Sequence, residues 1–122
     1  MKSDIAFRSA RKLAKMVGRK EVGCLELLDH YIDRVERHDG KINAVVVRDF
    51  ERARARARAA DNARDGKRGA LHGVPMTVKE SYNVAGLATT WGVEANRGNI
   101  ARRNAVLVDR LFAAGANVFG KT

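Results

Sequence analysis

Helical and strand-like hydrophobic patterns alternate along this chain, and this alternation limits its fold more than any other feature of the sequence. Apolar residues recur with helical spacing in three segments, at Ala10, Leu13, Ala14 and Val17, at Leu25, Leu28, Ile32 and Val35, and at Val106, Leu107, Leu111 and Phe112. Short apolar runs of strand length lie between and after them, at residues 42–47, 75–79 and 117–119. The alternation predicts an α/β architecture in which helices cover a sheet.

Capping residues set the expected ends of these elements. Ser9 begins a first helix that ends at Val17, and Gly23 begins a second, with a glutamate three residues on as in a capping box. Asp49 is expected to cap an arginine-rich helix, and Asn104 a last helix. Residues 81–103 lack either periodicity and predict a long irregular connection.

The expected sheet is small for the helices around it. Three short strands cannot cover the apolar faces of four helices, so we expect the sheet to continue into sequence outside these 122 residues. The length allows one domain, and no repeat, low-complexity tract or linker indicates a second.

A net charge of +10 raises the question of a nucleic-acid or membrane-surface partner. On a helix, the arginine-rich segment separates into two basic groups beside an apolar side: Arg52 with Arg56, Arg54 with Arg58, and the alanines Ala53, Ala57 and Ala60. This pattern predicts a surface helix with a solvated basic face. No aromatic residue lies among these arginines to stack on bases, so we expect no nucleic-acid partner. A non-catalytic basic module that binds nucleic acid is the alternative of another class.

Cysteine and histidine usage argues against disulfide and metal chemistry. Cys24 is the single cysteine, and the three histidines show no metal-ligand spacing, so we expect no metal centre. No apolar run approaches the roughly eighteen residues of a membrane span. Charged residues within positions 1–15 stand where a secretory signal would be apolar. We therefore expect no membrane partner and a cytoplasmic location.

The last eight residues, Gly115 to Thr122, match the spacing of a phosphate-binding P-loop. A P-loop needs a buried strand before its first glycine, so that backbone N–H groups and a following helix converge on phosphate. Here a helix precedes the glycine, and the interior of the supposed loop is Ala-Asn-Val-Phe. We therefore reject nucleotide binding.

A more specific motif lies in the stretch LHGVPMTVKESYNVAGLATTWG, where Lys79 ends a short strand that a Gly-Val-Pro turn begins. With the helix LELLDHYIDRVERHD, the INAVVVRD run, the alanine-rich helix and the terminal RLFAAGANVFGKT, this motif resembles the amidase signature family of serine-dependent amide hydrolases. The resemblance covers most of the chain. It implies that residues 1–122 are the N-terminal part of a single amidase domain, truncated before its serine- and glycine-rich half. The fold would then be an incomplete N-terminal part of that family's mixed sheet covered by helices.

The resemblance also implies a catalytic Ser-Ser-Lys machinery whose lysine falls on Lys79. A nucleophilic serine attacks the amide carbonyl, a second serine on a cis peptide bond relays the proton, and the lysine acts as base and then as acid. A lysine in this role needs a closed, dry pocket that lowers its pKa by about three units, or on the order of 4 kcal/mol. Both serines are expected beyond Thr122. The isolated chain would therefore be inactive, whereas the complete enzyme would hydrolyse small-molecule carboxylic amides without a metal or organic cofactor.

One alternative within the family is the glutaminase subunit of a tRNA-dependent amidotransferase, which would need partner subunits.

We interpret the residues around the lysine motif as structural. We interpret Ser81 as a loop serine that bonds locally rather than a nucleophile, and His72 as a loop histidine. For Trp91 we favour core packing over substrate contact. Ala88 departs from the family pattern, in which proline is common at this position.

Overall fold

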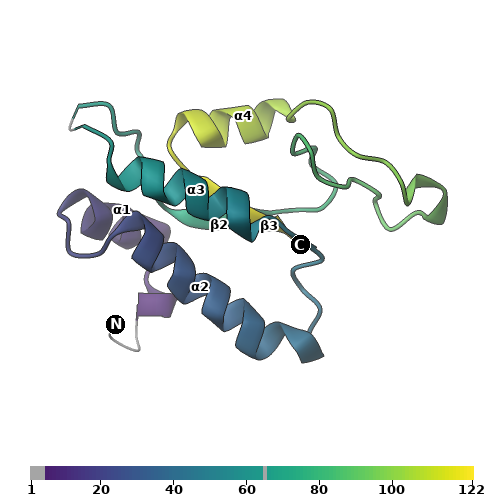
Figure 1. Ribbon diagram of the computed structural model, residues 1–122, viewed down its shortest axis with the longest axis horizontal. Coiled ribbons are helices and arrows are strands. Elements are labelled where there is room, and N and C mark those ends of the chain that lie inside the picture. Colours follow the sequence, from purple (N-terminus) through teal and green to yellow (C-terminus); the bar gives the residue numbers. More distant parts are fainter. Residues whose placement is uncertain (1–4, 65) are drawn as a thin grey trace.

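The computed structural model describes residues 5–64 and 66–122. Within these residues the chain forms helices and strands that alternate in the order shown in Figure 1: α1 (Ala10–Gly18), α2 (Cys24–His38), β1 (Val47–Arg48), α3 (Phe50–Asp61), β2 (Pro75–Val78), α4 (Val106–Ala113) and β3 (Asn117–Lys121). Short 3-10 turns occupy Ile5–Phe7, Asp39–Lys41 and Glu94–Asn96. The expected helices at the start of the chain, the strand beginning at Pro75 and the irregular connection after it are confirmed.

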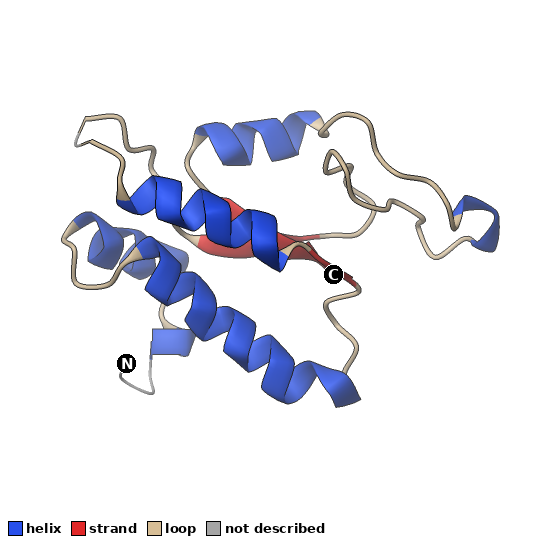
Figure 2. Ribbon diagram, in the orientation of Figure 1, coloured by secondary structure: helices blue, strands red, loops and turns tan. Residues whose placement is uncertain are grey.

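The strands form one mixed sheet with β3 in the centre (Figure 2). β1 pairs with β3 in antiparallel orientation, and β2 pairs with β3 in parallel orientation. The parallel register shifts between Met76 and Thr77: Met76 lies opposite Val118, but Thr77 lies opposite Gly120. β3 thus carries one extra residue at this bulge.

Helices cover both faces of the sheet. Phe119 of β3 joins a buried cluster with α2 and α3, whereas its neighbour Val118 joins a second cluster with Val108 of α4. Because successive residues of a strand point to opposite faces, α2 and α3 lie on one side of the sheet and α4 on the other. The predicted α/β architecture is confirmed as a mixed sheet covered by helices.

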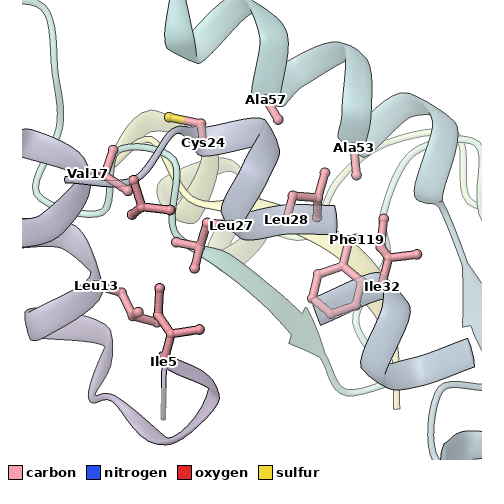
Figure 3. Packing of buried hydrophobic residues seen from close by; sticks show 11 residues of the cluster. Ile5, Leu13, Val17, Cys24, Leu27, Leu28, Ile32, Ala53, Ala57 and Phe119 are labelled. Carbon is pink, nitrogen blue, oxygen red and sulfur yellow. The ribbon is translucent and has the colours of Figure 1, made fainter. Parts of the chain in front are cut away.

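The larger core lies between α2, α3 and the sheet (Figure 3). Leu28 and Ile32 of α2 are fully buried against Ala53 and Ala57 of α3, whose small side chains let the two helices approach closely. The ring of Phe119 closes the cluster from the sheet side. The predicted apolar alanine side of the arginine-rich helix is therefore confirmed.

The expected strand over residues 42–47 is wrong for most of its length, because the strand that forms is limited to Val47 and Arg48, with one further hydrogen bond from Val46 N–H to the Lys121 carbonyl. The buried carboxylate of Asp39 accepts the backbone N–H of Ala44 at 2.7 Å and so holds the preceding residues as a loop. This N–H is the main cause that lowers the pKa of Asp39 below its usual range. Asn43 adopts a positive φ of 53°, and Ile42 is left exposed.

The last helix also begins later than expected. Ala105, not Asn104, is its N-cap, and the Asn104 side chain instead accepts the N–H of Ala85 at 2.7 Å and donates to Asp109. The helix ends before Gly115, as expected, and Gly115 itself has a φ of +89°. A Cβ at Gly115 would lie 2.8 Å from the Cα of His72, so both the turn and the close approach require glycine. The following strand continues past its expected end to Lys121.

The solvated basic face predicted for α3 is wrong for Arg54 and Arg56, which are partly buried, whereas Arg52 and Arg58 are exposed as predicted. The guanidinium of Arg56 donates to the Val118 carbonyl at 2.6 Å, and Arg52 donates to the Ala85 carbonyl at 3.0 Å. Arg54 pairs with Asp29 of α2 at 2.8 Å. These side chains tie α3 to its neighbours, which further disfavours a nucleic-acid-binding module.

Within residues 5–64 and 66–122, no helix combines the length and apolar character needed to cross a bilayer. Residues 1–4, the first part of the segment on which the absence of a secretory signal was predicted, lie outside the described residues. The cytoplasmic location stays a prediction.

Candidate active site

Lys79 directly follows β2, at the edge of the sheet where the carboxyl ends of the parallel strands β2 and β3 meet. The backbone there is fixed by two hydrogen bonds across the strands. Thr122 N–H donates to the Val78 carbonyl at 2.8 Å, and Glu80 N–H donates to the Thr122 carbonyl at 2.7 Å. The Lys79 side chain itself is exposed. The fold therefore presents this amine from a rigid backbone.

A mostly apolar pocket of about 500 Å³ lies at this edge. Its lining comes from the ends of both parallel strands, from the residue before β1 and from the long loop: Val46, Lys79, Glu80, Ser81, Thr90, Trp91, Gly92 and Thr122. An apolar pocket with a few convergent polar groups is the usual form of a small-molecule site. The structure thus brings Lys79 and Ser81 to one pocket.

The expectation that Trp91 packs in the core is wrong. The residue is 70% exposed and adopts a positive φ of 56°, and it lines the pocket that Lys79 shares. Its backbone N–H is held by the carboxylate of Glu80 at 2.9 Å, so the backbone is anchored while the ring stays outside the core.

Glu80 holds the loop that carries Trp91. Its carboxylate accepts the backbone N–H of Thr90 at 2.6 Å and the Thr90 hydroxyl at 3.1 Å, in addition to the N–H of Trp91. Burial alone would raise the pKa of Glu80, but these hydrogen bonds outweigh it and hold the pKa below its usual range. The side chain is therefore a carboxylate at neutral pH.

Lys121, the last residue of β3, is fully buried. Its amine donates to the Ala88 carbonyl and, at 2.9 Å, to the Thr89 hydroxyl. Burial lowers the pKa of Lys121, and the negative charge of Glu80 acts in the opposite direction. Sequence reasoning gave this lysine no role of its own, either in the P-loop spacing or in the terminal segment of the family resemblance. The signal that could have found it is a lysine continuing an apolar strand, where a charged side chain needs partners.

The same region confirms that the P-loop match is accidental. Asn117 to Lys121 form the central strand, and their ends are paired in the sheet: Asn117 N–H donates to Val74, and Thr122 N–H donates to Val78. These amides cannot converge on a phosphate.

The contacts of the other candidate residues are structural. Ser81 lies in a turn closed by a hydrogen bond from Tyr82 N–H to the Lys79 carbonyl, which agrees with a loop serine. His72 Nε2 lies 3.0 Å from the Ala60 carbonyl and lines a different pocket from Lys79. Burial, with Asp61 as the next cause, raises the pKa of Cys24 to about 12, so its thiol is not an activated nucleophile.

Among residues 5–64 and 66–122, no group of three or more His, Cys, Asp or Glu side chains could hold a metal ion. The pocket itself offers an amine, a carboxylate and hydroxyl groups beside an apolar wall.

Comparison with known proteins assigns the class of this chain. The Amidase family matches residues 26–122, and the chain belongs to that family. AmiB2 of Mycobacterium tuberculosis, a protein named as an amidase, is 41% identical over 121 residues, which are 98% of this chain and 26% of that protein. An acylamidase of Rhodococcus erythropolis is 38% identical over 123 residues, covering 98% of this chain and 25% of the relative. A glutamyl-tRNA(Gln) amidotransferase subunit of an Anaeromyxobacter species is 38% identical over 113 residues, covering 91% and 23%.

Solved structures agree on the fold. A 6-aminohexanoate cyclic dimer hydrolase in complex with substrate superposes with a TM-score of 0.84 at 30% identity, over 97% of this chain and 24% of the other. A bacterial aryl acylamidase of the amidase signature family superposes with a TM-score of 0.88 at 24% identity, over 94% and 25%, and shows the shared fold. The chain spans about a quarter of the length of the curated relatives it matches.

Proposed function

We propose that residues 1–122 are the N-terminal part of an amidase domain and supply the lysine and one wall of an active site that hydrolyses carboxylic amides. The observation that carries this proposal is the position of Lys79. The amine is presented at an apolar pocket by the paired ends of two parallel strands, in a chain that belongs to the Amidase family. A rigid backbone suits a catalytic group, because small displacements of such a group cost much of its effect.

In this proposal Lys79 carries a proton between the two halves of the reaction. It accepts the proton of a serine hydroxyl, through a second serine, while the serine oxygen bonds to the amide carbonyl carbon. It then returns that proton to the nitrogen as the C–N bond breaks, and water hydrolyses the acyl serine in the second half. An amine serves as a base at neutral pH only in a dry site, and Lys79 is exposed here. The nucleophile, its relay serine and the covering wall are therefore assigned to sequence outside these residues.

The substrate class that fits is a small-molecule amide, since the pocket is of small-molecule size and mostly apolar. A second candidate is the glutaminase subunit of a tRNA-dependent amidotransferase, which the 38% identity to an amidotransferase subunit favours. The two differ in their need for partners. Glutamine hydrolysis that appears only with added partner subunits would favour the second candidate over the first.

Replacing Lys79 by methionine tests the role of the amine. The product of the complete reading frame that carries residues 1–122 is assayed on a panel of aliphatic and aryl amides and on glutamine. We expect Lys79→Met to lower kcat about 10²- to 10⁴-fold, because a general acid-base is removed without loss of side-chain length. Lys12→Met, at an exposed position on α1, is the matched control and should leave turnover unchanged.

Full turnover by a folded Lys79→Met protein, with folding checked by circular dichroism, would remove the proposed role. The 122-residue chain alone is expected to be inactive on the same panel. Turnover by the short chain that Lys79→Met abolishes would show instead that these residues hold a complete site.

A further inference from the structure

Lys121 is a buried cation that the proposed chemistry does not use. Its side chain is fully buried at the end of the central strand. Burying an ammonium group is costly unless it is hydrogen-bonded, and an apolar side chain of similar length would fill the same space without that cost. The partners that compensate the amine, the Ala88 carbonyl and the Thr89 hydroxyl, both belong to the long loop over residues 81–103.

Glu80 makes the complementary contact from the neighbouring strand. It follows β2 as Lys121 ends β3, and its backbone N–H bonds to Thr122, the residue after Lys121. The cation holds a carbonyl and a hydroxyl of residues 88 and 89, whereas the carboxylate holds the N–H groups of Thr90 and Trp91. Two opposite charges at the ends of adjacent parallel strands therefore fix four consecutive loop residues.

Two of those four residues form part of the wall of the Lys79 pocket. Thr90 and Trp91 line it, and Trp91 is held at a positive φ that a residue with a side chain adopts only under constraint. Regular structure in this loop is limited to one short 3-10 turn and a bridge between Ala88 and Ile100. Asn99 and Asn96 bond to residues 89 and 90 from within the loop, whereas the two charged side chains bond residues 88–91 to the strand ends beside Lys79.

We propose that Lys121 is a positioning residue which, together with Glu80, holds residues 88–91 in a fixed position, so that Thr90 and Trp91 form a fixed wall of the amide-binding pocket. The proposal rests on the proposed function in taking this pocket as the active site. Lys121 does not itself line the pocket. It acts through the loop backbone, and we name the pair Lys121 and Glu80 the loop clasp.

Hydrogen exchange tests the clasp without any assay of activity. The product of the complete reading frame is compared as wild type, Lys121→Met and Thr89→Val, with Lys12→Met as the control, by hydrogen exchange and mass spectrometry. Lys121→Met removes the donors at nearly constant length, and the milder Thr89→Val removes one acceptor. We expect peptides within residues 84–101 to exchange at least tenfold faster in both variants, while peptides of α2 exchange as in wild type. A merely structural loss would instead accelerate exchange in all slowly exchanging segments together.

Measurements of amide hydrolysis then test whether the clasp affects the pocket. We expect kcat/KM to fall about tenfold in Lys121→Met and less in Thr89→Val, with Lys12→Met unchanged. If Lys79→Met abolishes turnover but both clasp variants exchange and react like Lys12→Met, the clasp is overturned and the proposed function stands. If loop exchange rises but the wild-type protein hydrolyses no amide, the clasp stands and the proposed function fails. Faster exchange with unchanged kcat/KM overturns the positioning role.

Discussion

The helical layer and the long loop of this protein are held in place by different forces. Residues 5–61 pack α1, α2 and α3 around fully buried apolar side chains such as Leu28 and Ile32. The loop over residues 81–103, which extends away from the helices in Figure 1, buries Val84 and Leu87 in the second cluster, but its residues 88–91 are held by hydrogen bonds, among them those from Glu80 and Lys121. Apolar packing is non-directional and shared by many neighbours, whereas a hydrogen bond depends on one donor and one acceptor. One region of a fold can thus supply its stability while another sets the geometry of its site.

Leu28→Ala should have the largest effect on stability. The side chain is fully buried in the main cluster, so its truncation leaves a cavity and should lower the free energy of unfolding by about 2–5 kcal/mol. Urea denaturation measures the change. Leu107→Ala on α4, at a position 42% exposed, is the matched control and should cost less than about 1 kcal/mol. If Leu28→Ala and Leu107→Ala lowered the free energy of unfolding equally, the main cluster would not be packed more tightly than the exposed side of α4.

Cys24 provides a pH-dependent test of the same layer. Its thiol has an ordinary pKa of 9.0, raised to about 12 in the folded protein, mainly by burial. The unfolded chain therefore releases a proton that the folded chain keeps, and the stability contributed by this group is complete below pH 9 and is lost as the pH rises toward 12. We expect a loss of about 1 kcal/mol between pH 9 and pH 10.

Denaturation midpoints of wild type and Cys24→Ala across this range measure the contribution of the thiol. The difference in free energy of unfolding between the two proteins should change with pH by the stated amount. A constant difference would show that the thiol titrates alike in both states, and hence that the layer does not exclude water there.

Asn99→Ala should have the smallest effect, confined to the loop. The side-chain amide donates to the Thr89 carbonyl at 2.7 Å from an exposed position, and its loss should cost about 0.5–1.5 kcal/mol at most. Hydrogen exchange should quicken within residues 84–101 and stay unchanged in α2. Faster exchange throughout the chain would contradict the separation of the two regions.

Sequence reasoning located the elements whose signals are local. The stripe and capping glutamate of α2 and the proline that begins β2 are close in sequence to what they control, and both elements were predicted. The prediction of a strand over residues 42–47 failed because the Asp39 carboxylate accepts a backbone N–H that a strand would use. The β-branched residues that predicted the strand give no information about such a competing acceptor.

Within the candidate site, the sequence predicted only the residue that belongs to a recognisable motif. Lys79 could be selected from its motif, and its catalytic role stays a prediction. The exposure of Trp91 and the burial of Lys121 could not be read, because each depends on contacts between segments about 10 to 30 residues apart. An exposed aromatic residue and a buried lysine both reverse the ordinary preference of their side-chain type, and such reversals are frequent near functional sites.

The bulge in β3 determines how Lys79 and Lys121 are placed relative to each other. Met76 sits beside Val118, so an unbroken ladder would place Val78 beside Gly120 and bring Lys121 abreast of Lys79, with two like charges on one face. The extra residue reverses the odd-even parity of the strand beyond that point and sets Lys121 beside Val78 instead. A single inserted position thereby separates the two amines, leaving one for the solvent-open pocket and the other for the interior.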